Sequence, residues 1–404
     1  MMNREERTIV ALTGCSHAFS HGCMLIFPAV LLLLQKEYSL GYLQLGVIGN
    51  IMNFTYGLGA LPGGMIYNYF GPKKLYLLCL LGSAMALILV GISSSLILLT
   101  AGLALLGALG SIYHPLANSL ITSKVREYGR ALGIHGATGN IGLAITPFVA
   151  GLIASYHGWR EAYLLFALPG IALSIWALFV DMPLAERTKP TDRSTLPEET
   201  FLRNLRKYFT PPLTCLYVIN ILNVFCYFGT ITFLPIYMAK RTSFHFFSLD
   251  SVALAGMLSA IVLFMGVFGQ FGGGLLSQRK NLERNFFFVA VIGFPFLLVM
   301  SFATDFLFLV LALTYFFFNF FIQPMNNTLI AQHATVGMRG TAFGIYFSIA
   351  FGVGSLASSF SGYIAQNFGL QWVFMGLSAS GMLMAFFAFL LLKMKRRAKE
   401  LSSK

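Results

Sequence analysis

Long apolar runs recur along the whole chain and are separated by short polar intervals. A helix needs about 20 predominantly apolar residues to cross the hydrocarbon core of a bilayer. Twelve runs approach or exceed this length, at 9–34, 44–67, 75–92, 96–121, 131–155, 160–180, 211–239, 251–276, 285–302, 305–330, 341–365 and 370–392. The pattern therefore predicts an all-α membrane protein with twelve transmembrane helices.

The longest polar interval, 181–210, divides these runs into two sets of six. It contains three prolines and many charged residues, so we interpret it as a linker between a half at 1–180 and a half at 211–404. The halves repeat one another at an offset of 211 residues. Gly129, Ala131, Gly133 and Ile134 match Gly340, Ala342, Gly344 and Ile345. Two six-helix halves in the same order are an architecture of secondary transporters.

Polar residues are distributed unevenly among the runs. The third, sixth, ninth and twelfth runs are almost uniformly apolar, which predicts that they face lipid. The first, fourth, seventh and tenth runs contain His17, His21, His114, Asn118, Asn220, Asn223, Asn319, Gln323, Asn326 and Asn327. Polar side chains at membrane depth face a bundle interior or a water-filled cavity. These four runs are therefore predicted to line a central path.

Composition and charge agree with this interpretation. Hydrophobic residues make up 57% of the chain and charged residues only 10%, whereas soluble domains contain about 25% charged residues. The net charge is +13, but all except four of the 27 Lys and Arg residues fall on the side of the predicted termini. This is the positive-inside pattern, so both termini are predicted to be cytoplasmic. The basic residues are scattered over short loops, and we expect no nucleic-acid partner.

Histidines are the titratable side chains near neutral pH at predicted membrane depth, at His17, His21, His114 and His135. His17 and His21 are separated by about 40° around a helix. Cys15 and Cys23 lie at least about 120° from both on the same wheel, so GCSHAFSHGC forms no single metal site on a straight helix. We expect no cofactor and no resident metal. The imidazoles are candidates for proton and solute contact, and Asn118, Asn223, Gln323 and Asn327 for hydrogen bonds to a solute.

Two stretches resemble a known family. GMIYNYFGPKK, after the second run, is similar to the Gly-x-x-x-Asp-x-x-Gly-Arg-Arg/Lys loop of the major facilitator superfamily. Gly64, Gly71 and Lys73 fit that pattern, and the resemblance implies a gating role for them and for Asn68, which replaces the acid. Pro72 replaces a basic residue. Because Asn68 and Pro72 carry no charge, we expect the cytoplasmic gate to be held closed less tightly.

The second stretch resembles the fosmidomycin-resistance branch of bacterial facilitators. GSIYHP places Gly110, Ser111, His114 and Pro115 on the branch's fourth-span motif. The fifth-span motif is matched by Gly139, Asn140, Gly142, Ala144 and Pro147. In the first span, His17 and Pro28 fit, whereas His21 stands in the place of an aspartate. The resemblance implies a monomeric, multi-pass efflux protein of the bacterial inner membrane.

Together these observations predict a transporter and not an enzyme. We expect export of a small, anionic organic solute by alternating access, driven by proton exchange, with the solute, protons and the lipid bilayer as partners. A protonated cavity would attract an anion. Two alternatives stay open. One is transport of a transition metal or metal chelate by the intramembrane histidines. The other is a receptor or assembly protein that uses a facilitator scaffold without transporting.

Overall fold

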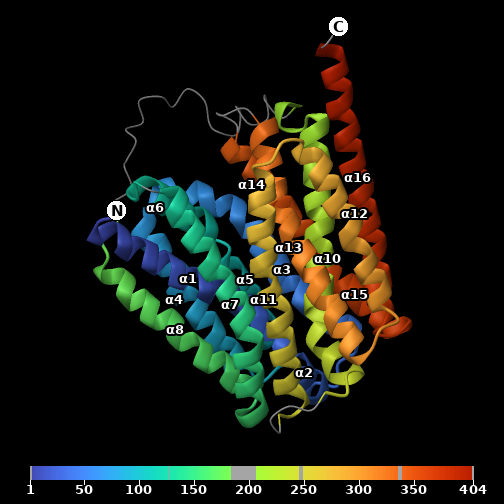
Figure 1. Cartoon of the computed structure of the whole chain (residues 1–404). Coiled ribbons are helices and arrows are strands. Elements are labelled where there is room, and N and C mark those ends of the chain that lie inside the picture. The colour runs from blue at the N-terminus through green and yellow to red at the C-terminus, as the bar shows by residue number, and fades with distance from the viewer. Residues whose placement is uncertain (1, 127, 183–205, 245–248, 335–338, 403–404) are drawn as a thin grey trace.

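The computed structural model describes residues 2–126, 128–182, 206–244, 249–334 and 339–402 (Figure 1). Fifteen helices occupy this part of the chain, and their order follows the predicted apolar runs. Most of the predicted linker, 183–205, lies outside the described residues. The division into halves at this linker therefore stays a prediction from the sequence.

Two groups of helices lie side by side, blue to green and yellow to red in Figure 1. We call them the N-terminal and the C-terminal bundle. The N-terminal bundle contains α1 (Arg4–Ala29), α2 (Leu31–Glu37), α3 (Tyr42–Phe70), α4 (Pro72–Gly91), α5 (Leu96–Gly110), α6 (Tyr113–Lys124), α7 (Tyr128–His157) and α8 (Trp159–Phe179). The C-terminal bundle contains α10 (Pro211–Arg241), α11 (Ser251–Ser277), α12 (Leu282–Met300), α13 (Asp305–His333), α14 (Arg339–Gly354), α15 (Leu356–Asn367) and α16 (Trp372–Ser402).

Local chemistry explains where several helices begin and break. Asn3 and Glu6 form a capping box at the start of α1, in which each side chain accepts a hydrogen bond of 2.8 Å from the other's backbone amide. The predicted run 96–121 is divided into α5 and α6. Pro115 supplies no amide hydrogen to the carbonyl of Ser111, four residues earlier, which weakens the helix at this point. The break places His114 in the first turn of α6.

Ten helical segments of the described chain are long and apolar enough to cross a membrane. The broken run 96–121 is not among them, because α5 has only 15 residues and α6 only 12. The run 44–67 falls within α3, whose side chains at 60–69 are outside the described part. The number twelve, and the cytoplasmic position of the termini, therefore stay predictions from the sequence.

Burial is highest in α1 and α10, but it does not follow the predicted pattern throughout, since the most apolar window is 56% buried in α4 and only 44% buried in α13. The most apolar 18-residue window is 72% buried in α1 and 67% buried in α10, but only 39% buried in α8 and in α12. Large apolar side chains are exposed along the helices of the predicted lipid-facing runs. They include Leu78, Leu81 and Met85 on α4, Leu165 and Leu168 on α8, Phe288 and Ile292 on α12, and Met382 and Phe386 on α16. This outer surface suits hydrocarbon rather than water.

The two bundles meet through glycines, which allow helix backbones to approach closely. On α11, a Cβ atom added at Gly256 would lie 2.3 Å from the carbonyl oxygen of Pro147 on α7. On α3, a Cβ atom at Gly46 would lie 2.2 Å from the carbonyl oxygen of Ser358 on α15. The pairs α7–α11 and α3–α15 therefore form two seams between the bundles.

At the end of the molecule opposite both termini, polar contacts join the bundles (Figure 1). The Lys240 ammonium, at the end of α10, donates to the Tyr42 hydroxyl at 3.0 Å and to Oε1 of Gln35 at 3.4 Å. The backbone amide of Tyr42 donates to Oε1 of Gln366 on α15 at 2.8 Å. In this structure the bundles are thus closed against each other at the end far from the termini.

Candidate functional site

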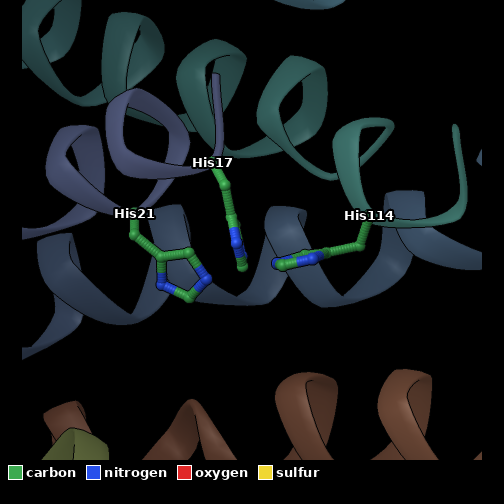
Figure 2. A group of neighbouring side chains, drawn as sticks. All are labelled: His17, His21 and His114. Carbon is green, nitrogen blue, oxygen red and sulfur yellow. The ribbon is translucent and has the colours of Figure 1, made fainter. Parts of the chain in front are cut away.

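Three histidines from α1 and α6 converge inside the N-terminal bundle. Figure 2 shows the His17 ring between those of His21 and His114. The ring centroids of His17 and His21 are 4.5 Å apart, as their spacing of one helical turn allows. The His114 ring lies 5.0 Å from His17 and 5.3 Å from His21. His17 is buried, whereas His21 and His114 are partly exposed.

His135 of α7 completes a group of four imidazoles. Its ring stacks on that of His17 with a centroid distance of 4.0 Å and an interplanar angle of 8°. Nδ1 of His17 donates a hydrogen bond of 2.6 Å to the backbone carbonyl of His135. The structure therefore brings together the four histidines named from the sequence, and α1, α6 and α7 each contribute to the cluster.

Glycine on α7 makes room for the buried ring. A Cβ atom at Gly139 would lie 2.5 Å from two atoms of the His17 imidazole, which is far too close. Three residues later, a Cβ atom at Gly142 would lie 2.2 Å from the carbonyl oxygen of Ala18. These two residues of the fifth-span motif thus have a packing role, since they let α7 approach the histidine face of α1.

Replacing Gly139 by Ala is expected to destabilise the protein by about 1–3 kcal/mol, because overpacking forces side chains and backbone to move. The His17 ring would be displaced and its hydrogen bond to His135 lost. Thermal unfolding of the purified protein measures the effect. Gly136→Ala, one turn earlier on α7, is the matched control, because a Cβ atom there meets nothing within 4 Å. Equal unfolding midpoints for the two variants would contradict the packing argument.

A tyrosine that the sequence reasoning missed supports the cluster. The Tyr113 ring lies 5.6 Å from His17 and 5.9 Å from His135, stacked on both. Its hydroxyl donates to the backbone carbonyl of Thr13 on α1. Tyr113 thereby joins α6 to α1 beside the histidines. The available signal in the sequence was its position directly before His114.

A chain of side-chain amides connects the bundles. Nδ2 of Asn140 on α7 donates to Oε1 of Gln270 on α11 at 2.5 Å. Nε2 of Gln270 then donates to Oε1 of Gln323 on α13 at 2.9 Å. Gln323 was a candidate from the sequence, but Gln270 was not, because its run had not been assigned to the central path.

The asparagine candidates have different surroundings. Asn223 is buried in the C-terminal bundle, where its Oδ1 accepts from Nδ2 of Asn319 at 3.0 Å. Asn319 also contacts the Tyr315 hydroxyl, at 3.1 Å. Asn118 is exposed on α6, and Asn327 is half-buried on α13 with an Oδ1 atom that has no hydrogen-bond partner among the described residues. Asn223 is thus engaged within its own bundle, whereas the Oδ1 atom of Asn327 is buried without a partner among the described residues.

The predicted gating residues lie at the α3–α4 connection. Gly64 and Asn68 are on α3, but their side chains belong to the part that is not described. Gly71 has φ = 77° at the start of α4, in the region that favours glycine. The Lys73 ammonium donates to the carbonyl of Leu178 at 2.6 Å, near the end of α8. Lys73 therefore ties α4 to the terminal carbonyls of α8.

Known proteins resemble the chain over most of its length. The model of the Major Facilitator Superfamily matches residues 10–359. The probable sulfoacetate transporter SauU of Cupriavidus necator is 27% identical over 362 residues, which cover 83% of this chain and 82% of that protein. The fosmidomycin resistance protein of Escherichia coli is 24% identical over 382 residues, which cover 91% and 88%. In a solved structure, an inward-facing bacterial homologue of the human lysosomal transporter Spinster has the same fold, with a TM-score of 0.80, 14% identity and 97% coverage of each chain.

Proposed function

The chain belongs to the major facilitator superfamily, and on that premise we propose that it exports a small anionic organic solute across the bacterial inner membrane in exchange for protons. It is a membrane transporter of small solutes and not an enzyme. We further propose that it works as a monomer, with the N-terminal and C-terminal bundles as the two units that alternate in access.

The histidine cluster carries this proposal. The predicted spans contain no Asp, Glu, Lys or Arg away from their ends. Imidazole has an ordinary pKa near 6.5, so these histidines are the side chains of the spans whose ordinary pKa lies nearest neutral pH. The rings of His17, His21 and His114 are in mutual contact, and the His135 ring stacks on that of His17. His21 and His114 are partly exposed. These two are the proposed sites of proton exchange with the solute path.

The sign of the solute follows from the same chemistry. A protonated imidazole in a low-dielectric cavity attracts an anion and repels a cation. The relative SauU is named as a probable transporter of sulfoacetate, an organic anion, and the relative from Escherichia coli is named for fosmidomycin resistance. The first name supports an anionic substrate class and the second supports export. The free Oδ1 of Asn327 suits a hydroxyl or amide donor on the same solute.

Alternating access requires one end of the molecule to open as the other closes. Contacts of Lys240 and Gln366 with Tyr42 hold the far end closed in this structure. Those contacts are hydrogen bonds near the surface, each of which contributes about 0.5–1.5 kcal/mol. Solute binding can thus supply enough free energy to shift the bundles.

Thermal unfolding of the purified protein tests the proposed substrate class. Small organic anions, sulfoacetate first, are expected to raise the unfolding midpoint more at pH 6 than at pH 8, because a ligand that binds the folded state stabilises it by mass action. Organic cations of similar size serve as controls and are expected to have no effect at either pH. Stabilisation by cations alone, or by anions equally at both pH values, would contradict the proposal.

A further inference from the structure

We propose that His17, His21 and His114 also form a binding site for a divalent transition-metal ion such as zinc. One ring nitrogen of each residue lies within 4.8 Å of those of the other two. The three ligands come from two helices, α1 and α6, of a single bundle. A bound ion and a proton would compete for the same lone pairs of His21 and His114, so the test of this inference measures metal binding directly and does not use transport.

The hydrogen bond of His17 determines which nitrogen is available. The carbonyl of His135 can only accept, so Nδ1 of His17 carries the hydrogen in the bond of 2.6 Å. In the neutral ring, Nε2 then has a free lone pair. This Nε2 is buried and has no hydrogen-bond partner among the described residues, and the residue as a whole is 7% exposed. Metal-ligating histidines are held in the same way, with the other ring nitrogen donating to a carbonyl or carboxylate.

The positions of the other two rings favour a shared ion. His21 and His114 flank the free end of the His17 ring (Figure 2). Ligand nitrogens of a tetrahedral zinc site lie about 3.4 Å from one another, since each Zn–N bond is about 2.0–2.1 Å. The present separations of up to 4.8 Å need only a small rotation of the side chains. His21 and His114 are partly exposed and have room to make it.

The donor set determines the class of ion. Imidazole nitrogens suit zinc, copper, nickel and cobalt, whereas calcium and magnesium prefer oxygen ligands. Three histidines leave the fourth position of a tetrahedral ion open. A water molecule or an oxygen atom of an anionic solute could fill it, and a bound anion would offset part of the ion's charge. The site is therefore suited to hold a metal ion and an anion together.

Metal titration of the full-length protein in detergent, after removal of bound metal by a chelator, tests this proposal. We expect one Zn²⁺ per chain by isothermal titration calorimetry, and a visible absorption spectrum of tetrahedral nitrogen-coordinated Co²⁺. His17→Ala, His21→Ala and His114→Ala should each weaken Zn²⁺ binding by about tenfold or more. His157→Ala, at the exposed end of α7, is the control for binding by surface histidines and should leave the affinity unchanged.

His135→Ala provides a sharper comparison, because it removes the stacked ring but keeps the backbone carbonyl that orients His17. Its Zn²⁺ affinity should stay within about threefold of the parent protein. Metal-free unfolding midpoints show whether each variant is folded, and His21→Gln and His114→Gln replace any alanine variant that is not. No Zn²⁺ binding by the parent protein, equal affinity in the variants of His17, His21 and His114, or an equal loss in His135→Ala would overturn the proposal.

Discussion

Replacing His21 and His114 together by alanine is expected to abolish uphill movement of solute driven by a pH difference. The two partly exposed imidazoles are the proposed exchange sites, and their loss leaves the path without a side chain that can carry a proton there. One pH unit corresponds to about 1.4 kcal/mol per proton. At zero membrane potential the parent protein should thus build a solute concentration ratio across the membrane of up to about tenfold per proton exchanged. The double variant should keep this ratio near one.

Proteoliposomes with an imposed difference of one pH unit and a clamped potential provide the measurement. The probe is the labelled organic anion that stabilises the purified protein best. His157→Ala, which alters an exposed histidine at the end of α7, should accumulate as much solute as the parent protein. If the double variant builds the same gradient as the parent, these histidines do not couple protons to transport.

Replacing Gly256 by leucine is expected to lower the initial rate of transport by about tenfold or more. A Cβ atom at this position of α11 already lies 2.3 Å from the carbonyl oxygen of Pro147 and 3.4 Å from Cα of Gly151, both on α7. Overpacking typically costs about 1–3 kcal/mol. Because backbone atoms cannot move aside as a flexible side chain does, α11 would be pushed away from α7 along the seam between the bundles.

Gly274→Leu is the matched control, since Gly274 is on the same helix and a Cβ atom there meets nothing within 4 Å. Rates are compared per amount of inserted protein, which separates loss of transport from loss of yield. Transport by Gly256→Leu at the parent rate would show that α7 and α11 can be pushed apart at this seam without loss of transport. The close approach of the two helices would then have no role in transport.

Much of the fold could be predicted because the bilayer imposes a simple pattern. Every predicted apolar run is largely helical in the described structure, although 9–34, 96–121 and 341–365 are each divided between two helices. The spacing of His17 and His21 by four residues predicted a shared face, which their ring contact at 4.5 Å shows. His114 was expected on the central path because polar side chains on apolar helices avoid lipid, but the contact of the His114 and His135 rings with that of His17 was not predicted.

Other features depend on tertiary contacts that no local pattern contains. The 2.6 Å bond from His17 ends on the backbone carbonyl of His135, and every residue except the last supplies such a carbonyl. The Gln270 link between Asn140 and Gln323 depends on how α7, α11 and α13 pack. The run 96–121 was predicted as one span because its apolar character continues across the point where α5 ends at Gly110.

Tyr42 contacts the C-terminal bundle at two points, with its hydroxyl to Lys240 of α10 and its backbone amide to Gln366 of α15. Since both groups belong to one residue at the start of α3, neither contact can be released by a separate movement of that helix. Separation of the bundles at this end must therefore break both contacts. One residue of α3 thus couples the opening of this end to two helices of the C-terminal bundle at once.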